Sequence, residues 1–464
     1  MLTYDLTTTP KGELYETLYK YIRDDIAAGR FKAGEKLPSK RTLAKNLGIS
    51  TITVECAYAQ LTSEGYVYSL PKRGYYIANL NTAPHRPTAV TNADIILPTT
   101  RPCYRIDFSN NQTNPAHFPF ATWKKLLREV IAEESQALME KSPSGGVYAL
   151  RQAIAEHLRA FRGMNVEPDQ IIVGAGTEYL YGLLIQLFGR ERIYCTENPG
   201  YRKIAQIYRA QGVTCRFAGM DENGIRVADL RKTCADIAHV GPTHQFPTGI
   251  TMPVSRRYEL LAWASEKPDR AIIEDDYDSE FRLHGKPIPA LQSLDASASV
   301  VYMNTFTKSL ASTIRISYMV LPVTLANAFY ERLSFYACTV SNFEQFTLAR
   351  FLSEGYFEKH INRMRLFYAR RRQQVLDAIA QSPLADRCTI IEQDSGLHFL
   401  LELDTQRTDR TLSDCLAKEG IHLSPLSDYY ETGAPTASHR FLLSYANLDM
   451  TQLPDALATI ARLL

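Results

Sequence analysis

The sequence predicts two domains of different fold class: a small α+β domain over residues 1–78 and a large α/β domain with a mostly parallel sheet over residues 104–464. Three observations lead to this prediction. The chain, at 464 residues, is longer than most single domains. Its first 78 residues alternate helical patterns with a short pair of strands. From residue 104 onward, short apolar runs alternate with amphipathic helices, which is typical of buried parallel strands covered by helices.

The bulk composition is that of a globular protein, with 45% hydrophobic and 22% charged residues. Residues 79–103 differ, because four prolines and many Thr and Asn predict an extended linker. No apolar run is long enough to span a membrane, and the N-terminus lacks the pattern of a signal peptide, so a cytoplasmic protein is expected. The eight cysteines have neither disulfide nor zinc spacing, which predicts buried, reduced thiols and no metal site.

The first domain is predicted to contain three helices, over residues 14–28, 41–47 and 51–64. In the first, apolar residues recur every four positions. Ser39 can cap the second helix, and Gly48 separates the second from the third. Two helices joined by a tight turn with glycine have the spacing of a helix-turn-helix.

Candidate DNA contacts cluster at two places in this domain. Strands over 67–70 and 74–77 flank a basic tip, so they predict a two-stranded wing. Small hydroxyls begin the third helix, where they can reach base edges or phosphates. Residues 1–78 also carry eleven Lys and Arg against eight Asp and Glu. The candidates are Ser39, Lys40, Arg41, Ser50, Thr51, Thr53, Lys72 and Arg73.

The pattern alone also allows a small helical adaptor domain with a solvated charged loop. Residues 37–44, 50–54 and 61–67, together with the Arg73-Gly74-Tyr75 wing, closely resemble the GntR-type winged helix over its whole length. That resemblance implies a double-stranded DNA operator as partner.

In the second domain, polar residues follow the predicted strands at 171–173, 192–195, 271–273 and 300–303. Lys308 comes after a strand and a hydroxyl-rich segment containing Thr305 and Thr307, and Arg315 follows seven residues later. Asp275 ends another strand, with Tyr277 two residues on.

A glycine-rich turn containing Gly176 and Thr177 precedes a helix, where backbone NH groups favour an anion. Tyr201 follows a further strand. An amine, a carboxylate, a phenol, a stacking aromatic ring and an anion cradle are the groups that pyridoxal phosphate (PLP) requires. Taken singly, each has another reading: a lone lysine is usually a solvated surface charge, and Asp275-Asp276-Tyr277-Asp278 could be an exposed acidic turn or a weak cation site.

The ordered set resembles the fold type I aminotransferases from about residue 105 to the C-terminus, through residues 148–155, 242–249, 273–281, 305–311 and 315–318. Fused to the winged helix, it resembles the MocR/GabR subfamily of GntR regulators, leaning towards the PdxR-like regulators of vitamin B6 synthesis. The resemblance implies a homodimer formed through the large domain.

By the same resemblance, Lys308 is the lysine that forms a Schiff base with PLP, Asp275 the partner of the ring nitrogen, Tyr277 the phenol and Tyr201 the stacking ring. Thr305, Thr307 and Arg315 would bind the phosphate.

Three departures from the aminotransferase pattern bear on activity. Phe246 stands where aminotransferases have an asparagine, with Gln245 beside it as a candidate cofactor contact. Lys141-Ser142 replaces a tyrosine. Arg440, the candidate for an effector carboxylate, lies two residues before its expected position.

The leading hypothesis is therefore a PLP-sensing transcriptional regulator that responds to PLP or to an amino compound. The alternative is a PLP-dependent aminotransferase with an accessory DNA-binding domain. A third hypothesis, a DNA-binding protein with a mere dimerisation scaffold, leaves the joint presence of Lys308, Asp275, Tyr277 and Arg315 unexplained.

Overall fold

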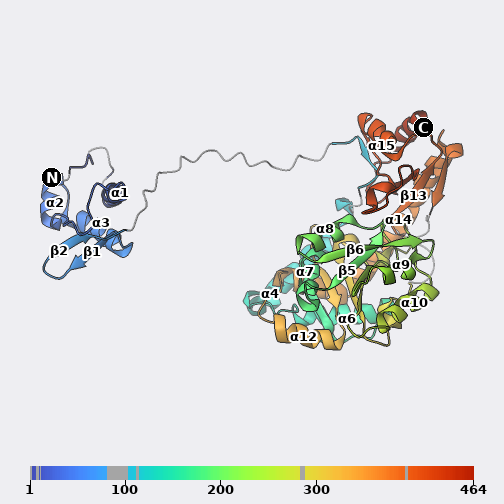
Figure 1. The fold of residues 1–464 in the computed structure, drawn as a ribbon, viewed down its shortest axis with the longest axis horizontal. Coiled ribbons are helices and arrows are strands. Elements are labelled where there is room, and N and C mark those ends of the chain that lie inside the picture. The colour runs from blue at the N-terminus through green and yellow to red at the C-terminus, as the bar shows by residue number, and fades with distance from the viewer. Residues whose placement is uncertain are drawn as a thin grey trace. The chain divides into compact units, whose positions relative to one another are not determined.

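The computed structural model describes residues 3–6, 10, 12–80, 103–110, 114–282, 288–391 and 396–464. The chain divides into two compact units, residues 1–101 and 102–464, each drawn in Figure 1. Most of the predicted linker, residues 81–102, lies outside the described residues.

The first unit contains three helices followed by a two-stranded antiparallel sheet, which confirms the predicted winged helix-turn-helix. Leu18 and Ile22 of the first helix pack against Val54, Tyr58 and Leu61 of the third helix, and all five side chains are fully buried. The elements are α1 (Leu14–Ala27), α2 (Lys40–Leu47), α3 (Thr51–Ser63), β1 (Val67–Leu70) and β2 (Gly74–Ile77).

Side-chain caps fix both helices of the helix-turn-helix. Ser39 Oγ accepts a hydrogen bond from the Thr42 NH at the start of α2, as the sequence predicted. Ser50 Oγ accepts one from the Thr53 NH at the start of α3. Gly48 ends α2 with a φ of 66°, a left-handed conformation that glycine adopts without strain.

The second unit is built on an eight-stranded sheet with the order β4-β11-β10-β9-β8-β5-β6-β7. The five central strands from β10 to β6 run parallel, which confirms the predicted mostly parallel α/β fold. The strands are β4 (Ile171–Gly174), β5 (Ile193–Asn198), β6 (Thr214–Asp221), β7 (Gly224–Ile225), β8 (Ile237–Val240), β9 (Ala271–Asp275), β10 (Val300–Thr305) and β11 (Ser317–Val320).

Helices cover both faces of this sheet because successive strand residues point to opposite sides. Ile273 of β9 packs with the helices α7, α8 and α12, whereas its neighbour Ile272 packs with α9 and α10. The helices are α4 (Phe120–Glu133), α5 (Ser135–Met139), α6 (Tyr148–Arg162), α7 (Thr177–Phe188), α8 (Arg202–Ala210), α9 (Val227–Lys232), α10 (Val254–Ser265), α11 (Phe306–Ser309), α12 (Val323–Leu333) and α13 (Asn342–Ser353).

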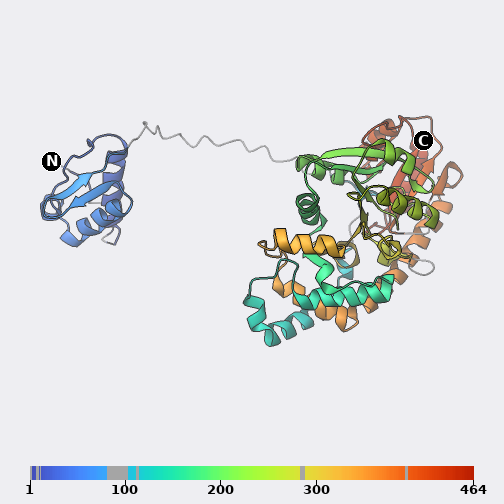
Figure 2. The ribbon, with the colours of Figure 1, turned by 60° about the horizontal axis from the view of Figure 1, so that its bottom comes forward.

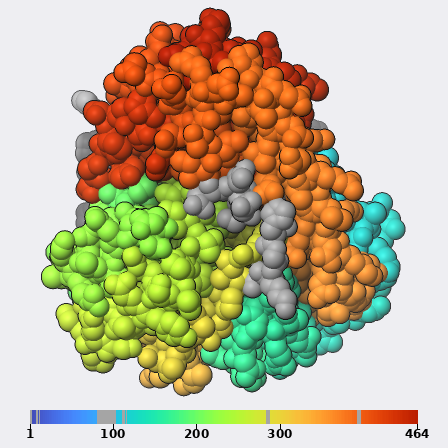
Figure 3. Space-filling view, turned by 90° about the vertical axis from the view of Figure 1, so that its right-hand side faces the viewer, coloured from blue at the N-terminus to red at the C-terminus, as the bar shows by residue number. Residues whose placement is uncertain are grey.

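A C-terminal lobe follows the long helix α14 (Tyr356–Ala380). In Figures 1 and 2 this lobe, orange to red, lies beside the large sheet, and Figure 3 shows it seated on the sheet-bearing part. Its antiparallel sheet has the order β12-β13-β15, and a parallel pair joins β14 to β3. The elements are β3 (Ile106–Asp107), β12 (Cys388–Ile391), β13 (His398–Leu403), α15 (Asp409–Lys418), β14 (Ile421–His422), β15 (Arg440–Ser444) and α16 (Leu453–Leu463).

The cysteine prediction needs a correction. All eight cysteines are free, but Cys56, Cys103 and Cys234 are exposed and only Cys195 and Cys338 are buried. Cys56 lies on the solvent-facing side of α3, and Cys103 and Cys234 lie outside the helices and strands. Within the part of the chain that the structure describes, no helix has the length and apolarity needed to cross a bilayer. The same residues contain no group of three His, Cys, Asp or Glu side chains able to hold a metal ion.

Candidate functional site

The carboxyl ends of the central strands bring the candidate residues of the large unit together. β9 ends at Asp275 and β10 at Thr305, and the two strands pair in parallel with Met303 opposite Asp275. The loops after β4, β5 and β8 leave the sheet at the same edge because these strands run in the same direction. Ligands of open α/β sheets bind at this edge.

Lys308 lies in α11, a single helical turn directly after β10. Thr305 begins that turn, and its hydroxyl accepts a hydrogen bond from the Thr307 NH. Burial lowers the pKa of Lys308 to about 8, although the nearby Asp278 carboxylate favours the charged amine. A buried lysine with a lowered pKa is suited to act as a nucleophile.

Asp275 is held by two side chains that the sequence reasoning missed. The Tyr181 hydroxyl donates to Asp275 Oδ2 at 2.7 Å, and His239 Nε2 lies 3.5 Å from the same oxygen. The Tyr208 hydroxyl fixes the His239 ring through a 2.7 Å hydrogen bond to Nδ1. The other carboxylate oxygen, Oδ1, is buried and has no hydrogen-bond partner among the described residues. Asp275 therefore keeps one acceptor for a ligand.

Tyr277 belongs to a second polar cluster, in which its hydroxyl lies 3.1 Å from His244 Nδ1. The same nitrogen lies 2.8 Å from Asp278 Oδ2, and the His244 ring stacks obliquely on His398 of the C-terminal lobe. Burial and the Asp278 carboxylate raise the pKa of Tyr277 well above its usual value, so the phenol stays protonated. Sequence reasoning missed both histidines because isolated histidines carry no spacing signal.

Phe246 forms one aromatic side of the site with Tyr201 and Tyr277. Its ring meets those of Tyr201 at 5.7 Å and Tyr277 at 6.4 Å, both nearly perpendicular. The amide of the adjacent Gln245 bonds with Glu197, the Pro199 carbonyl and Thr248. These hydrogen bonds of Gln245 brace the loop that leads to Tyr201, and its role as a cofactor contact stays a prediction.

Around the turn after β4, the chain forms an anion cradle. Gly176 precedes α7 with a φ of 95°, and a Cβ there would overlap the Arg315 guanidinium. Arg315 itself has a φ of 54°, an uncommon conformation for a residue other than glycine and one typical of functional sites. The hydroxyls of Thr307 and Ser317 bond to that of Thr305 at 2.7 and 2.8 Å. Backbone NH groups, hydroxyls and a guanidinium are the groups that bind phosphate.

Arg440 lies elsewhere. It begins β15, pairs with Glu402 at 2.6 Å, and lines a cavity of about 670 Å³ in the C-terminal lobe together with Tyr430 and His439. None of the predicted PLP contacts lines that cavity. The structure therefore does not bring Arg440 together with Lys308 by any described contact.

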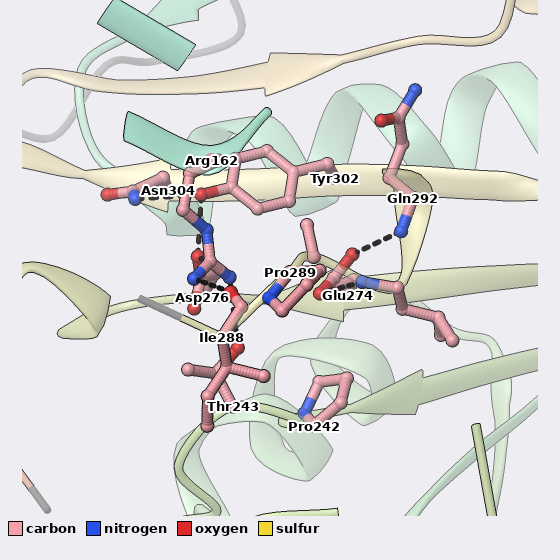
Figure 4. A network of polar contacts seen from close by, with 12 residues as sticks. Arg162, Pro242, Thr243, Glu274, Asp276, Ile288, Pro289, Gln292, Tyr302 and Asn304 are labelled. Atoms are coloured by element: carbon pink, nitrogen blue, oxygen red, sulfur yellow. Dashed lines mark hydrogen bonds and ion pairs between the residues drawn. The ribbon is translucent and has the colours of Figure 1, made fainter. Parts of the chain in front are cut away.

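A buried ionic network holds the carboxyl end of β9 in place (Figure 4). Arg162 pairs with Asp276 at 2.9 Å, with both side chains about 1% exposed, and the Tyr302 hydroxyl donates to the same carboxylate at 2.6 Å. Glu274 accepts hydrogen bonds from the Leu291 and Gln292 NH groups. Since Glu274 and Asp276 flank Asp275, these bonds fix the strand end that presents it.

The DNA candidates of the first unit differ in availability. Arg41, Thr51, Lys72 and Arg73 are exposed, and Lys72 has a φ of 61° at the wing tip. Lys40 pairs with Glu55 at 2.5 Å, and the hydroxyls of Ser39, Ser50 and Thr53 take part in helix caps. Sequence reasoning missed Ile52, an apolar side chain that is 71% exposed at the start of α3.

Comparison with known proteins shows that the two units also occur together in related proteins. Residues 14–77 match the family described as "Bacterial regulatory proteins, gntR family", and residues 105–460 match "Aminotransferase class I and II". The "Probable rhizopine catabolism regulatory protein MocR" of Rhizobium meliloti is 33% identical over 96% of this chain and 93% of its own. The chain belongs to the MocR/GabR subfamily of GntR regulators.

Other relatives of this MocR/GabR chain span both units too. An uncharacterized HTH-type transcriptional regulator of Bacillus subtilis, YdeL, is 37% identical over 94% of each chain. The pyridoxine biosynthesis regulator PdxR of Corynebacterium glutamicum is 30% identical over 96% of this chain and 94% of its own. Among solved structures, a kynurenine aminotransferase of Pyrococcus horikoshii has a TM-score of 0.69 and 24% identity, covering 78% of this chain and 91% of that one, and it confirms the fold of the large unit.

PLP is the cofactor of this aminotransferase family, and the residues fit it. The free oxygen of Asp275 suits a protonated ring nitrogen, and the cradle at Gly176 and Arg315 suits a phosphate. When bound, PLP would supply an aldehyde able to condense with a lysine amine, for which Lys308 is the candidate, and a ring that withdraws electrons.

Proposed function

We propose that this MocR/GabR regulator binds double-stranded operator DNA through α3 and the wing, and that PLP bound at Lys308 changes its operator affinity. The proposal includes a cytoplasmic homodimer that controls genes of vitamin B6 or amino-compound metabolism, as the PdxR and MocR relatives suggest. An amino compound acting together with PLP is included as effector.

One observation supports the proposal most directly: a full set of PLP-binding groups stands in a chain that also carries an exposed DNA-binding helix and wing. Lys308 provides the amine, Asp275 holds the ring nitrogen, Tyr277 keeps a protonated phenol, and Arg315 binds the phosphate. The Tyr181 hydroxyl bonds to one Asp275 carboxylate oxygen, and His239 lies beside the same oxygen, so the carboxylate is held in place.

Coupling between the two units has a thermodynamic requirement. A ligand shifts the DNA equilibrium only by its difference in affinity for the two conformations of the regulator. The C-terminal lobe is the part suited to respond, because His398 of that lobe contacts both His244 and the Pro247 carbonyl beside the PLP residues.

The test is a titration of operator DNA with and without PLP. The operator is first selected from DNA that flanks the gene. We expect PLP to change the Kd of the wild-type protein, and Lys308→Ala to blunt that change while binding DNA in the absence of PLP as wild type does. An operator Kd that is indifferent to PLP would refute the regulatory role of the site.

Slow transamination is the second candidate function, favoured by the lowered pKa of Lys308. Phe246 in the asparagine position and Arg440 paired with Glu402 argue against efficient turnover. We expect a coupled assay over common amino acids and amines to detect no, or very slow, multiple turnover. Fast turnover together with PLP-indifferent DNA binding would favour the aminotransferase.

A further inference from the structure

The anion cradle contains a negatively charged side chain of its own. Glu178 is the second residue of α7, directly after Gly176 and Thr177. Its Oε2 pairs with Arg315 Nη2 at 2.7 Å, and its Oε1 pairs with the Lys203 ammonium group at the start of α8. The three side chains are 38%, 46% and 47% exposed, so the cluster faces solvent rather than the core.

The Glu178 carboxylate pairs with the Arg315 guanidinium, the group that a ligand phosphate would otherwise contact. Arg315 lies against the Gly176 backbone, in the same cradle that is suited to phosphate. Pairing with Lys203 and Arg315 lowers the pKa of Glu178, so the carboxylate is charged at neutral pH. A phosphate carries a charge of about −1.5 to −2 at neutral pH, so it meets an arginine that is already neutralised and a like charge beside it.

We propose that Glu178 is a built-in competitor of the PLP phosphate, and that it tunes the affinity of the regulator for PLP. This inference rests on the proposed function. To accept phosphate, Arg315 must give up its pair with Glu178, and Glu178 must turn towards Lys203. The competition weakens PLP binding without altering the groups that hold the pyridine ring.

Weaker binding of PLP would suit a protein that senses the PLP concentration. A protein that reports a concentration must release its ligand when that concentration falls, since occupancy responds most steeply when the free ligand is near the Kd. A catalyst gains nothing from releasing its cofactor. Glu178 would therefore make PLP binding reversible, as a regulator requires, whereas an enzyme of the same fold requires tight cofactor binding.

The test compares Glu178→Gln with wild type in the full-length protein. The change removes the charge and keeps the size of the side chain. The matched control is Glu266→Gln, because Glu266 also bridges two cations, Arg231 and Arg270, at 2.7 Å each, and is 39% exposed. Visible absorbance of the bound cofactor gives the Kd for PLP and, separately, for pyridoxal, which has the aldehyde but no phosphate.

We expect Glu178→Gln to tighten PLP binding about tenfold, a size consistent with one screened charge contact. Pyridoxal binding should stay unchanged, as should both ligands with Glu266→Gln. The gain for PLP should shrink as salt is raised, because the repulsion is between exposed charges. A purely structural role for Glu178 would move neither the salt dependence nor the ratio of the two ligands.

Two outcomes would overturn the inference while leaving the proposed function intact. One is an unchanged or weaker affinity of Glu178→Gln for PLP, and the other is an equal gain for pyridoxal. A wild-type protein that takes up no PLP at all would remove both the proposed function and this inference.

Discussion

Lys308 and Asp275, the proposed amine and ring-nitrogen partner, have different surroundings in the structure. Burial lowers the pKa of the Lys308 amine to about 8, so about a tenth of the amine is uncharged at pH 7, far more than for an ordinary lysine. Asp275 accepts a hydrogen bond from the Tyr181 hydroxyl, and His239 Nε2 lies 3.5 Å from the same carboxylate oxygen. The two groups are therefore prepared for different tasks before a cofactor arrives.

The rate at which Lys308 becomes covalently attached to PLP should depend on pH. Only the uncharged amine attacks an aldehyde. Since a lowered pKa means that the amine loses its proton at lower pH, the attachment rate should rise through about pH 8 rather than near the value of a free lysine. Stopped-flow absorbance measures this rate, and borohydride reduction with peptide mass analysis identifies the lysine. An adduct on another lysine would contradict the assignment.

At the scale of elements, β9 and α3 show two ways of presenting a functional side chain. β9 presents Asp275 from a strand end that a buried ionic network holds on both sides. α3 presents its first turn to solvent, with a serine cap fixing where the helix begins. The first arrangement gives rigidity, and the second gives access to a partner.

Removing the partner of Arg162 should destabilise the large unit. Asp276→Ala leaves a buried guanidinium without its carboxylate, which costs about 3–5 kcal/mol in the free energy of unfolding. Urea titration followed by tryptophan fluorescence reports on this unit alone, because both tryptophans, Trp123 and Trp263, belong to it. Asp455→Ala is the control, since its pair with Arg105 is exposed and should contribute little. Equal loss in both variants would show that the network does not stabilise β9.

DNA binding should depend on exposed cations of the first unit. Arg41→Ala and Arg73→Ala should each weaken operator binding by a few-fold to tenfold and reduce its salt dependence, because phosphate contacts release counterions. Ile52→Ala should instead lower discrimination between operator and unrelated DNA, since an exposed apolar side chain can contact a thymine methyl group. PLP uptake should be unchanged in all three variants. Unaltered operator binding by both arginine variants would mean that another face meets DNA.

Periodic features of the sequence predicted the elements of the first unit and the main strands of the large sheet, whereas contacts between distant residues could not be predicted. The apolar runs of β9 and β10 and the cap at Ser39 were read correctly, because they depend on neighbours along the chain. Tyr181 and His239 were missed, since their contact with Asp275 joins residues up to 94 positions apart. The family resemblance supplied the roles of Lys308 and Arg315, but it gave no sign that Glu178 pairs with Arg315.

For the whole molecule, exposed apolar side chains on three helices bear on assembly. Phe120 of α4, Met139 of α5 and Tyr148 of α6 expose large apolar side chains, with Met139 76% exposed. All three helices pack against α13, so they form one part of the large unit. Exposed apolar side chains on helices that pack together are typical of protein interfaces, so we predict that a homodimer forms through this part of the large unit.

Light scattering should give twice the chain mass for the full-length protein at micromolar concentration. Met139→Glu and Phe120→Glu together should shift the protein towards a monomer, because burying two carboxylates in an interface is unfavourable. Leu366→Glu is the control, an apolar residue on α14 that is 63% exposed. A wild-type monomer, or a dimer that resists both glutamates, would contradict this interface.

The short parallel pair of β3 and β14 has a mechanical consequence. Arg105 and Phe108 donate hydrogen bonds to carbonyls of Gly420 and His422, and the Ser444 NH donates to the Phe108 carbonyl. The first residues of the large unit are thus built into the C-terminal lobe, the lobe that also carries His398 beside His244. Any rotation of that lobe on ligand binding must carry with it the point from which the chain departs for the DNA-binding unit.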